Sequence, residues 1–118
     1  MKVVCIGDIF ITDEMMENGV RPFLGEGDTM EVLFFGTRDK VGMRDIIKDV
    51  EAGRHDGIVL PEGLYETIVD ADLLVVHLCP IKRDLIEKAT KLKAIMSCRG
   101  GLENIDVQAA TDHKIIVS

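Results

Sequence analysis

Apolar residues gather in short continuous runs that are spaced along the chain and separated by more polar stretches. Val3-Val4-Cys5-Ile6 is the first run and Leu73-Leu74-Val75-Val76 is the strongest. Continuous apolar runs of this length are typical of strands that are covered on both faces, as in a parallel sheet. The runs predict five strands, at residues 3–6, 31–36, 73–76, 94–97 and 115–117.

Between these runs, apolar residues recur at helical spacing with capping residues beside them. The pattern predicts one helix capped by Thr12, one through residues 43–50 that ends at Gly53, one opened by Pro61, one through residues 85–92 and one from about Asp106. Strands that alternate with helices indicate a doubly wound parallel sheet. We therefore expect one α/β domain over residues 1–118, with a flavodoxin-like five-stranded sheet of order 2-1-3-4-5 and helices on both faces.

Charge and composition narrow the possible partners. The 118 residues carry a formal net charge of −7, which argues against nucleic-acid binding because that function needs a basic surface. No apolar run approaches the roughly 18–20 residues of a membrane span. The sequence begins directly with a predicted strand, so we expect no signal peptide. Three cysteines without metal-type spacing fit a reducing compartment, so we expect a cytoplasmic protein without a metal site.

The stretch from Ser97 to Asp106 is the strongest candidate for chemistry. It follows a predicted strand, contains Arg99, Gly100 and Gly101, and leads into a helix. Ligands of open α/β sheets bind at the carboxyl ends of the strands, and adjacent glycines can turn their N–H groups into an anion nest in front of a helix. Two structural alternatives remain open: the glycines form a tight turn only, and Arg99 is a solvated surface charge.

Two blocks of sequence resemble the substrate domain of the D-isomer-specific 2-hydroxyacid dehydrogenases, the family that includes D-3-phosphoglycerate dehydrogenase. The similarity covers most of residues 65–118. The first block is Ala71-Asp72-Leu73-Leu74-Val75-Val76-His77-Leu78-Cys79-Pro80, and the second contains Ala94-Ile95-Met96, Arg99-Gly100-Gly101, Asn104-Ile105-Asp106 and Ala109-Ala110.

The resemblance implies that this chain binds the substrate of an NAD-dependent oxidoreductase acting on small 2-hydroxy or 2-keto acids. The amides of Gly100 and Gly101 would hold the substrate carboxylate, with Val76, His77 and Leu78 nearby. The phosphoglycerate-specific pattern has an Arg-Ser pair where this chain has Val76-His77, which argues against a phosphorylated substrate. The family's catalytic arginine, glutamate and histidine would lie beyond residue 118, so no residue here takes a catalytic role.

The resemblance implies NAD for the full-length protein, yet no cofactor site is expected in this chain. A dinucleotide fingerprint needs glycines after a strand and before a helix. Gly25 and Gly27 instead precede a predicted strand.

Other classes of function fit the size and the fold less well. A receiver-like signalling module needs acidic residues after the first strand and an aspartate after the third; Asp8 fits the first requirement, but the third strand ends at His77. A thiol site at Cys79 or Cys98 beside His77 would need a basic partner in a partly exposed site.

The fifth predicted strand has no following helix to cover it, and this bears on whether the protein forms an oligomer. A parallel-sheet strand needs cover on both faces, and no helix follows Ile115-Ile116-Val117. We expect exposed apolar surface at this strand, which is a sheet edge, and a homo-oligomer that buries it.

Overall fold

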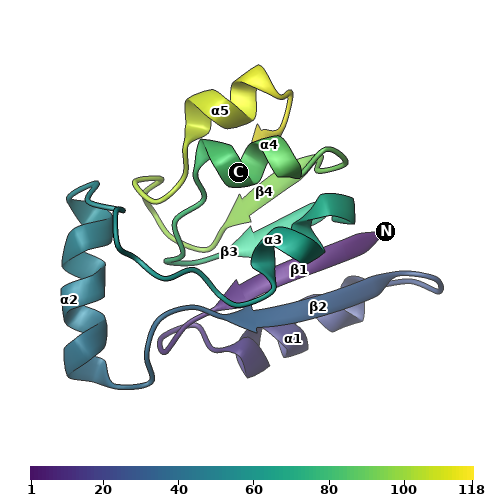
Figure 1. The fold of residues 1–118 in the computed structure, drawn as a ribbon. Coiled ribbons are helices and arrows are strands. Elements are labelled where there is room, and N and C mark those ends of the chain that lie inside the picture. The colour runs from purple at the N-terminus through teal and green to yellow at the C-terminus, as the bar shows by residue number, and fades with distance from the viewer.

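Five parallel strands form a single sheet in a computed structural model that describes residues 1–118 (Figure 1). The strand order is β2-β1-β3-β4-β5, with all pairs parallel. The predicted fold class and strand order are confirmed. The strands are β1 (Lys2–Gly7), β2 (Thr29–Phe34), β3 (Leu73–Val76), β4 (Ala94–Ser97) and β5 (Ile116–Val117).

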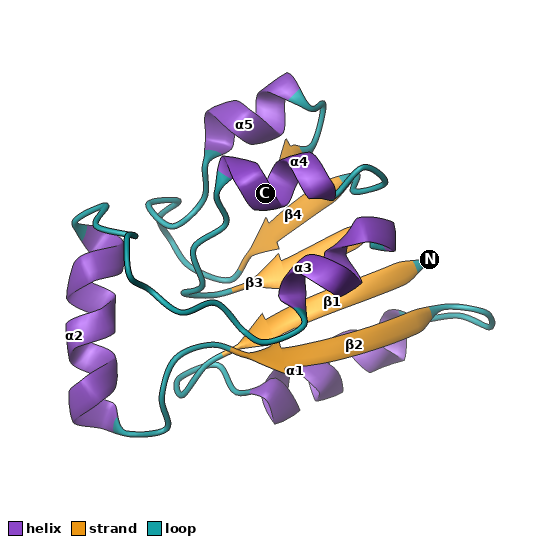
Figure 2. Cartoon of the chain, viewed as in Figure 1, coloured by secondary structure: helices purple, strands orange, loops and turns teal.

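Helices lie on both faces of this sheet, as expected. In Figure 2, α1 lies behind the sheet, whereas α3, α4 and α5 lie in front of it. The remaining helix, α2, stands beyond the carboxyl ends of the strands. No helix is both long enough and apolar enough to span a membrane. The helices are α1 (Asp13–Val20), α2 (Lys40–Glu51), α3 (Leu64–Thr67), α4 (Arg83–Lys88) and α5 (Val107–Asp112), with 3-10 turns η1 (Arg21–Phe23) and η2 (Ile68–Asp70).

Side chains along the central strands point alternately to the two faces of the sheet, and this divides the interior into two cores. Val3 and Cys5 of β1 pack toward α1 together with Met16, whereas Val4 and Ile6 belong to the larger core on the opposite face. Successive side chains of a strand point to opposite faces, so a continuous apolar run serves both cores. This explains why β1 and β3 could be recognised from their runs alone.

The ends of several elements differ from the sequence predictions. The second strand begins at Thr29 and ends at Phe34, two residues earlier at each end than expected. The helix expected to open at Pro61 begins at Leu64, because Gly63 takes a left-handed conformation with φ of 84°. Thr12 caps α1 as predicted, accepting from the N–H of Met15.

The α1 side of the sheet is left open at β4 and β5. Met96 is 47% exposed and Ile116 is 69% exposed, whereas Ile115 is buried on the other side. β5 is an edge strand, so the predicted exposure of apolar surface at the fifth strand is confirmed.

Candidate functional site

The carboxyl ends of β1, β3 and β4 bring three loops to one edge of the sheet. Asp8 follows β1, His77 follows β3 and Cys98 follows β4. The N–H of Cys98 donates to the carbonyl of Val76 at 2.8 Å, so the second and third of these loops start side by side. This edge is where open α/β sheets bind ligands.

Asp8 and His77 form a buried pair at the centre of this edge. The Asp8 side chain has no exposed surface. Its Oδ1 accepts from the N–H groups of Phe10 and Ile11, at 2.8 and 3.0 Å, and its Oδ2 lies 2.7 Å from Nδ1 of His77. Both oxygens therefore accept, which is the pattern of an ionised carboxylate. The pair requires a proton on Nδ1 of His77, and Nε2 makes no hydrogen bond within the chain.

Asn104 ties the loop after β4 to the loop after β3. It is 1% exposed, and its Nδ2 donates to the carbonyls of His77 and Cys79, at 3.1 and 2.9 Å. The backbone reinforces this link, since the N–H of Ile81 donates to the carbonyl of Asn104 at 2.7 Å. The two loops are thus held in a fixed relation.

The glycine turn carries backbone donors without partners. The N–H groups of Gly100, Gly101 and Leu102 make no hydrogen bond within the chain. Neither glycine has a positive φ, so the turn lacks the left-handed residue that an anion nest requires. What Gly101 provides is space, because a Cβ there would collide with the carboxylate of Glu103.

The helix behind the turn does not add to the site. α5 has six residues, and Asp106 already caps it by accepting from the N–H of Ala109 at 2.9 Å. The expected contribution of its N-terminus to anion binding is therefore not supported, although Asp106 is a cap as predicted.

Arg99 is not a solvated surface charge. Its side chain is 14% exposed, and its Nη2 lies 3.5 Å from Glu51 of α2 and 3.7 Å from Glu103. Nη1 is buried without a partner. The guanidinium thus joins α2 to the glycine turn, and two carboxylates offset its charge.

Of the three residues predicted at the end of β3 and after it, His77 alone can offer a side chain to this edge. The side chains of Val76 and Leu78 are buried in the larger core. The N–H groups of His77 and Leu78, like those of the glycine turn, make no hydrogen bond within the chain. Any role of Leu78 in binding therefore belongs to its backbone.

Thiol chemistry receives no support from the geometry. Burial raises the pKa of the Cys79 thiol, which has no exposed surface, far above its usual range. Burial, followed by the charge of Asp8, also raises the pKa of Cys98. A protonated thiol is a poor nucleophile and a poor metal ligand, and no group of three potential ligands in the chain could hold a metal ion.

Two further glycine-containing turns, one at Gly25 and Gly27 and one after β1, do not fit a dinucleotide. The turn at Gly25 and Gly27 precedes β2 at the opposite edge of the sheet, and the Asp28 carboxylate accepts from the N–H of Gly25. In the turn after β1, the N–H groups that could face a pyrophosphate donate to Asp8 instead. The buried carboxylate would repel a phosphate there.

Comparison with known proteins identifies the family. Residues 9–118 match the family model described as "D-isomer specific 2-hydroxyacid dehydrogenase, catalytic domain". The chain belongs to this family. The receiver-like alternative, which rested on Asp8 alone, is thereby set aside.

Individual relatives resemble this chain in part of its sequence or in its fold, and the chain spans only part of each. D-3-phosphoglycerate dehydrogenase of Methanocaldococcus jannaschii is 54% identical over 57 residues, which are 48% of this chain and 11% of that protein. An NAD+-bound 3-phosphoglycerate dehydrogenase of Entamoeba histolytica has a TM-score of 0.66 and 25% identity, over 99% of this chain and 32% of that one. An NAD-dependent formate dehydrogenase of Staphylococcus aureus in complex with NAD has a TM-score of 0.65 and 21% identity, over 99% of this chain and 30% of that one.

Asp8 and Asn104 were not assigned to the site from the sequence, whereas His77 was. Asp8 and His77 are 69 positions apart, but each directly follows an apolar run, and the predicted strand order makes the two runs neighbours. Their contact could have been found by combining strand order with loop position. Nothing in the sequence around Asn104 indicates its contact with the loop after β3.

Proposed function

We propose that this chain is the substrate-binding part of an NAD-dependent oxidoreductase that acts on D-2-hydroxy acids. In the direction of reduction, a hydride from the nicotinamide reaches C2 of a 2-keto acid and a proton reaches its oxygen, giving the 2-hydroxy acid. The residues of this chain bind and orient the acid at the carboxyl edge of the sheet. None of them is assigned a catalytic role.

One observation carries the proposal: five backbone N–H groups without partners lie in two loops that are tied together. They belong to residues 77, 78 and 100–102. A substrate carboxylate needs such donors, and N–H groups that converge on an anion are strong partners for it. The Asn104 bonds keep the loops in place before substrate arrives, which limits the entropy lost on binding.

NAD is the proposed cofactor of the full-length protein, with its site outside this chain. Support comes from the two NAD-bound structures that share this fold, and from the poor fit of both glycine turns here. The isolated chain should bind neither NAD nor NADH, and it should have no dehydrogenase activity. Calorimetric titration checks this, and saturable binding at sub-millimolar cofactor would contradict it.

The proposed activity is tested with the full-length protein. We expect oxidation of NADH when a small 2-keto acid such as glyoxylate, pyruvate or hydroxypyruvate is added, and formation of the D-enantiomer wherever the product is chiral. Pyruvamide is the control. It has an uncharged amide in place of the carboxylate of pyruvate, so it should not be reduced. Reduction of pyruvamide at the rate of pyruvate would contradict binding through the carboxylate, and failure to reduce any of the acids would contradict the function.

A homo-oligomer that covers the open side of β4 and β5 is also proposed. Met96 and Ile116 expose apolar surface there, and exposed apolar surface at a sheet edge favours association. Light scattering over a dilution series should show an oligomer that Ile116→Glu weakens. A monomer at high concentration would contradict this.

The cysteines are free, which suits the proposed cytoplasmic location.

A further inference from the structure

The charge balance at the carboxyl edge restricts the kind of acid that fits there. His77 and Arg99 are the two side chains in segments 76–81 and 97–104 that can carry a positive charge. Arg99 faces Glu51 and Glu103, and His77 faces the buried Asp8. Each cation is therefore matched by at least one carboxylate.

The net charge of the Asp8–His77 pair is zero or negative, and it is never positive. With His77 protonated, the imidazolium only offsets the Asp8 carboxylate 2.7 Å away; with His77 neutral, the pair is negative. Asp8 cannot move its charge toward water, because its side chain has no exposed surface. A negative charge that approaches this edge meets weakly screened repulsion.

A carboxylate and a phosphate place different demands on such an edge. A carboxylate carries one charge, and the unpartnered N–H groups of residues 77, 78 and 100–102 can satisfy it. A phosphate monoester adds about 1.5 to 2 further charges near pH 7. Segments 76–81 and 97–104 hold no unmatched cation for this second group.

We propose that the Asp8–His77 pair is a specificity device that admits 2-keto and 2-hydroxy acids with an uncharged substituent and rejects phosphorylated ones. This inference rests on the proposed function. Asp8 is the positioning residue: it holds the Nδ1 proton of His77 and leaves Nε2 available to an uncharged polar group. Specificity of this kind comes from an unfavourable charge directed against the wrong ligand. The substrate class therefore differs from the phosphoglycerate named for two of the relatives.

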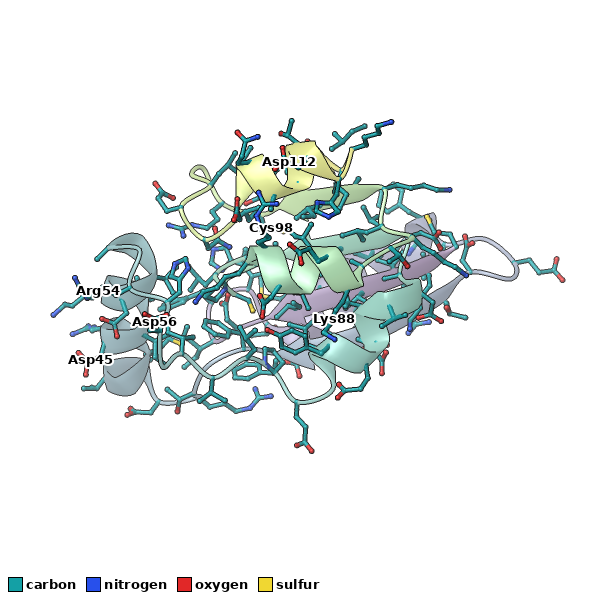
Figure 3. All side chains as sticks on the ribbon, turned by 45° about the horizontal axis from the view of Figure 1, so that its top comes forward. Asp45, Arg54, Asp56, Lys88, Cys98 and Asp112 are labelled. Carbon is teal, nitrogen blue, oxygen red and sulfur yellow. The ribbon has the colours of Figure 1, made fainter.

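The test compares hydroxypyruvate with 3-phosphohydroxypyruvate, two acids that differ by the phosphate alone. With the full-length protein and NADH, kcat/KM should favour hydroxypyruvate by about tenfold or more. Asp8→Asn removes one negative charge and should move this ratio toward the phosphorylated acid by about tenfold, mainly through KM. Asp45→Asn is the matched control. It makes the same change of net charge on exposed α2, at the left of Figure 3, and should leave the ratio unchanged.

Two further measurements test the role of Asp8 independently of the kinetic comparison. In 15N spectra of histidine, His77 should carry its proton on Nδ1, and Asp8→Asn should move it to Nε2 because the asparagine amide donates to Nδ1. If Asp8→Asn does not fold, His77→Gln is used in its place. Because the imidazole is lost, the charge of Asp8 has no cation beside it. The ratio of kcat/KM values should then favour hydroxypyruvate over the phosphorylated acid even more.

The possible failures are distinguishable. Absence of turnover with either acid would overturn the proposed function and this inference together. Turnover that favours the phosphorylated acid in the unaltered protein would overturn the inference alone. A ratio that Asp8→Asn and Asp45→Asn change equally would also overturn it, because the effect would then come from net charge.

Discussion

The two ends of the parallel sheet use their polar groups in opposite ways. At the amino end, Asp72 accepts from the N–H of Lys2 at 2.7 Å, the Lys2 amine pairs with Asp70, and Asp28 pairs with the chain's amino group. At the carboxyl end, the N–H groups of residues 77, 78 and 100–102 have no partner within the chain. The amino end is thus closed by bonds within the chain, whereas the carboxyl end keeps donors that are free in the chain and that we propose bind a ligand.

Burial of charge differs between the ends as well. The ion pairs at the amino end are partly exposed, and such pairs contribute little to stability. Asp8 at the carboxyl end is completely buried, where an ionised group is costly unless it is well bonded. Asp8 meets this condition through the N–H groups of Phe10 and Ile11 and through His77, so the two ends differ in how far their charged groups are buried.

Gly101→Val should have the largest effect and should be confined to activity. The side chain would collide with the Glu103 carboxylate and cover the N–H groups of the turn. We expect kcat/KM of the full-length protein to fall by about a hundredfold, with little change in thermal stability. The matched control is Gly25→Val at the amino end, where a Cβ makes only an ordinary contact at 3.5 Å. Equal losses of activity in both variants would remove the distinction between the ends.

Asn104→Ala should lower both stability and activity, because the two loops lose their link. The carbonyls of His77 and Cys79, in a partly buried and a buried bond respectively, would lose their donor. We expect the free energy of unfolding to fall by about 2 kcal/mol, as measured by urea denaturation, together with a rise in KM. A variant with lower stability and unaltered KM would show that the clamp supports the fold and not the site.

Asp72→Ala should affect stability alone. It leaves the N–H of Lys2 without its acceptor, and the free energy of unfolding should fall by about 1 kcal/mol. Since no ligand is proposed at the amino end, kcat and KM should match those of the unaltered protein. A loss of activity greater than the loss of folded protein would contradict the assignment of the two ends.

Glu103→Gln should produce the smallest change and should be favourable. The Glu103 carboxylate lies beside Gly101 and within 3.7 Å of Arg99, in the position where a substrate carboxylate would compete with it. Removal of this charge should lower KM by about threefold, the size expected for a half-exposed charge. An increased KM would indicate that Glu103 supports the turn.

The contrast between the ends also explains what the sequence could predict. The runs at β1 and β3 were recognisable because both faces of these strands are buried, so every position is apolar. The order of the strands followed from the alternation of strands and helices. Gly100 and Gly101 were correctly placed at the end of β4, but their conformation was not predictable from the residue type, since glycine adopts both hands of φ.

Contacts between distant residues account for most of what was missed. The environment of Arg99 depends on Glu51 of α2, and no local pattern shows that α2 stands at the carboxyl end of the strands. The same holds for Pro61, whose expected helix is delayed by the left-handed Gly63. By contrast, the contacts of His55 and His113 are local, since a ring nitrogen of each bonds to a carbonyl of the preceding helix.

The central claim is that the carboxyl end of the sheet binds the substrate carboxylate, and amide NMR of the 15N-labelled protein tests it most directly. Oxamate, an unreactive analogue of a 2-keto acid, is titrated into the protein while the N–H shifts of both ends are followed. The account predicts saturable changes at residues 77–78 and 100–102, with residues 25–28 and 70–72 unaffected. Changes concentrated at residues 25–28 and 70–72, or along α2 without the glycine turn, would contradict it.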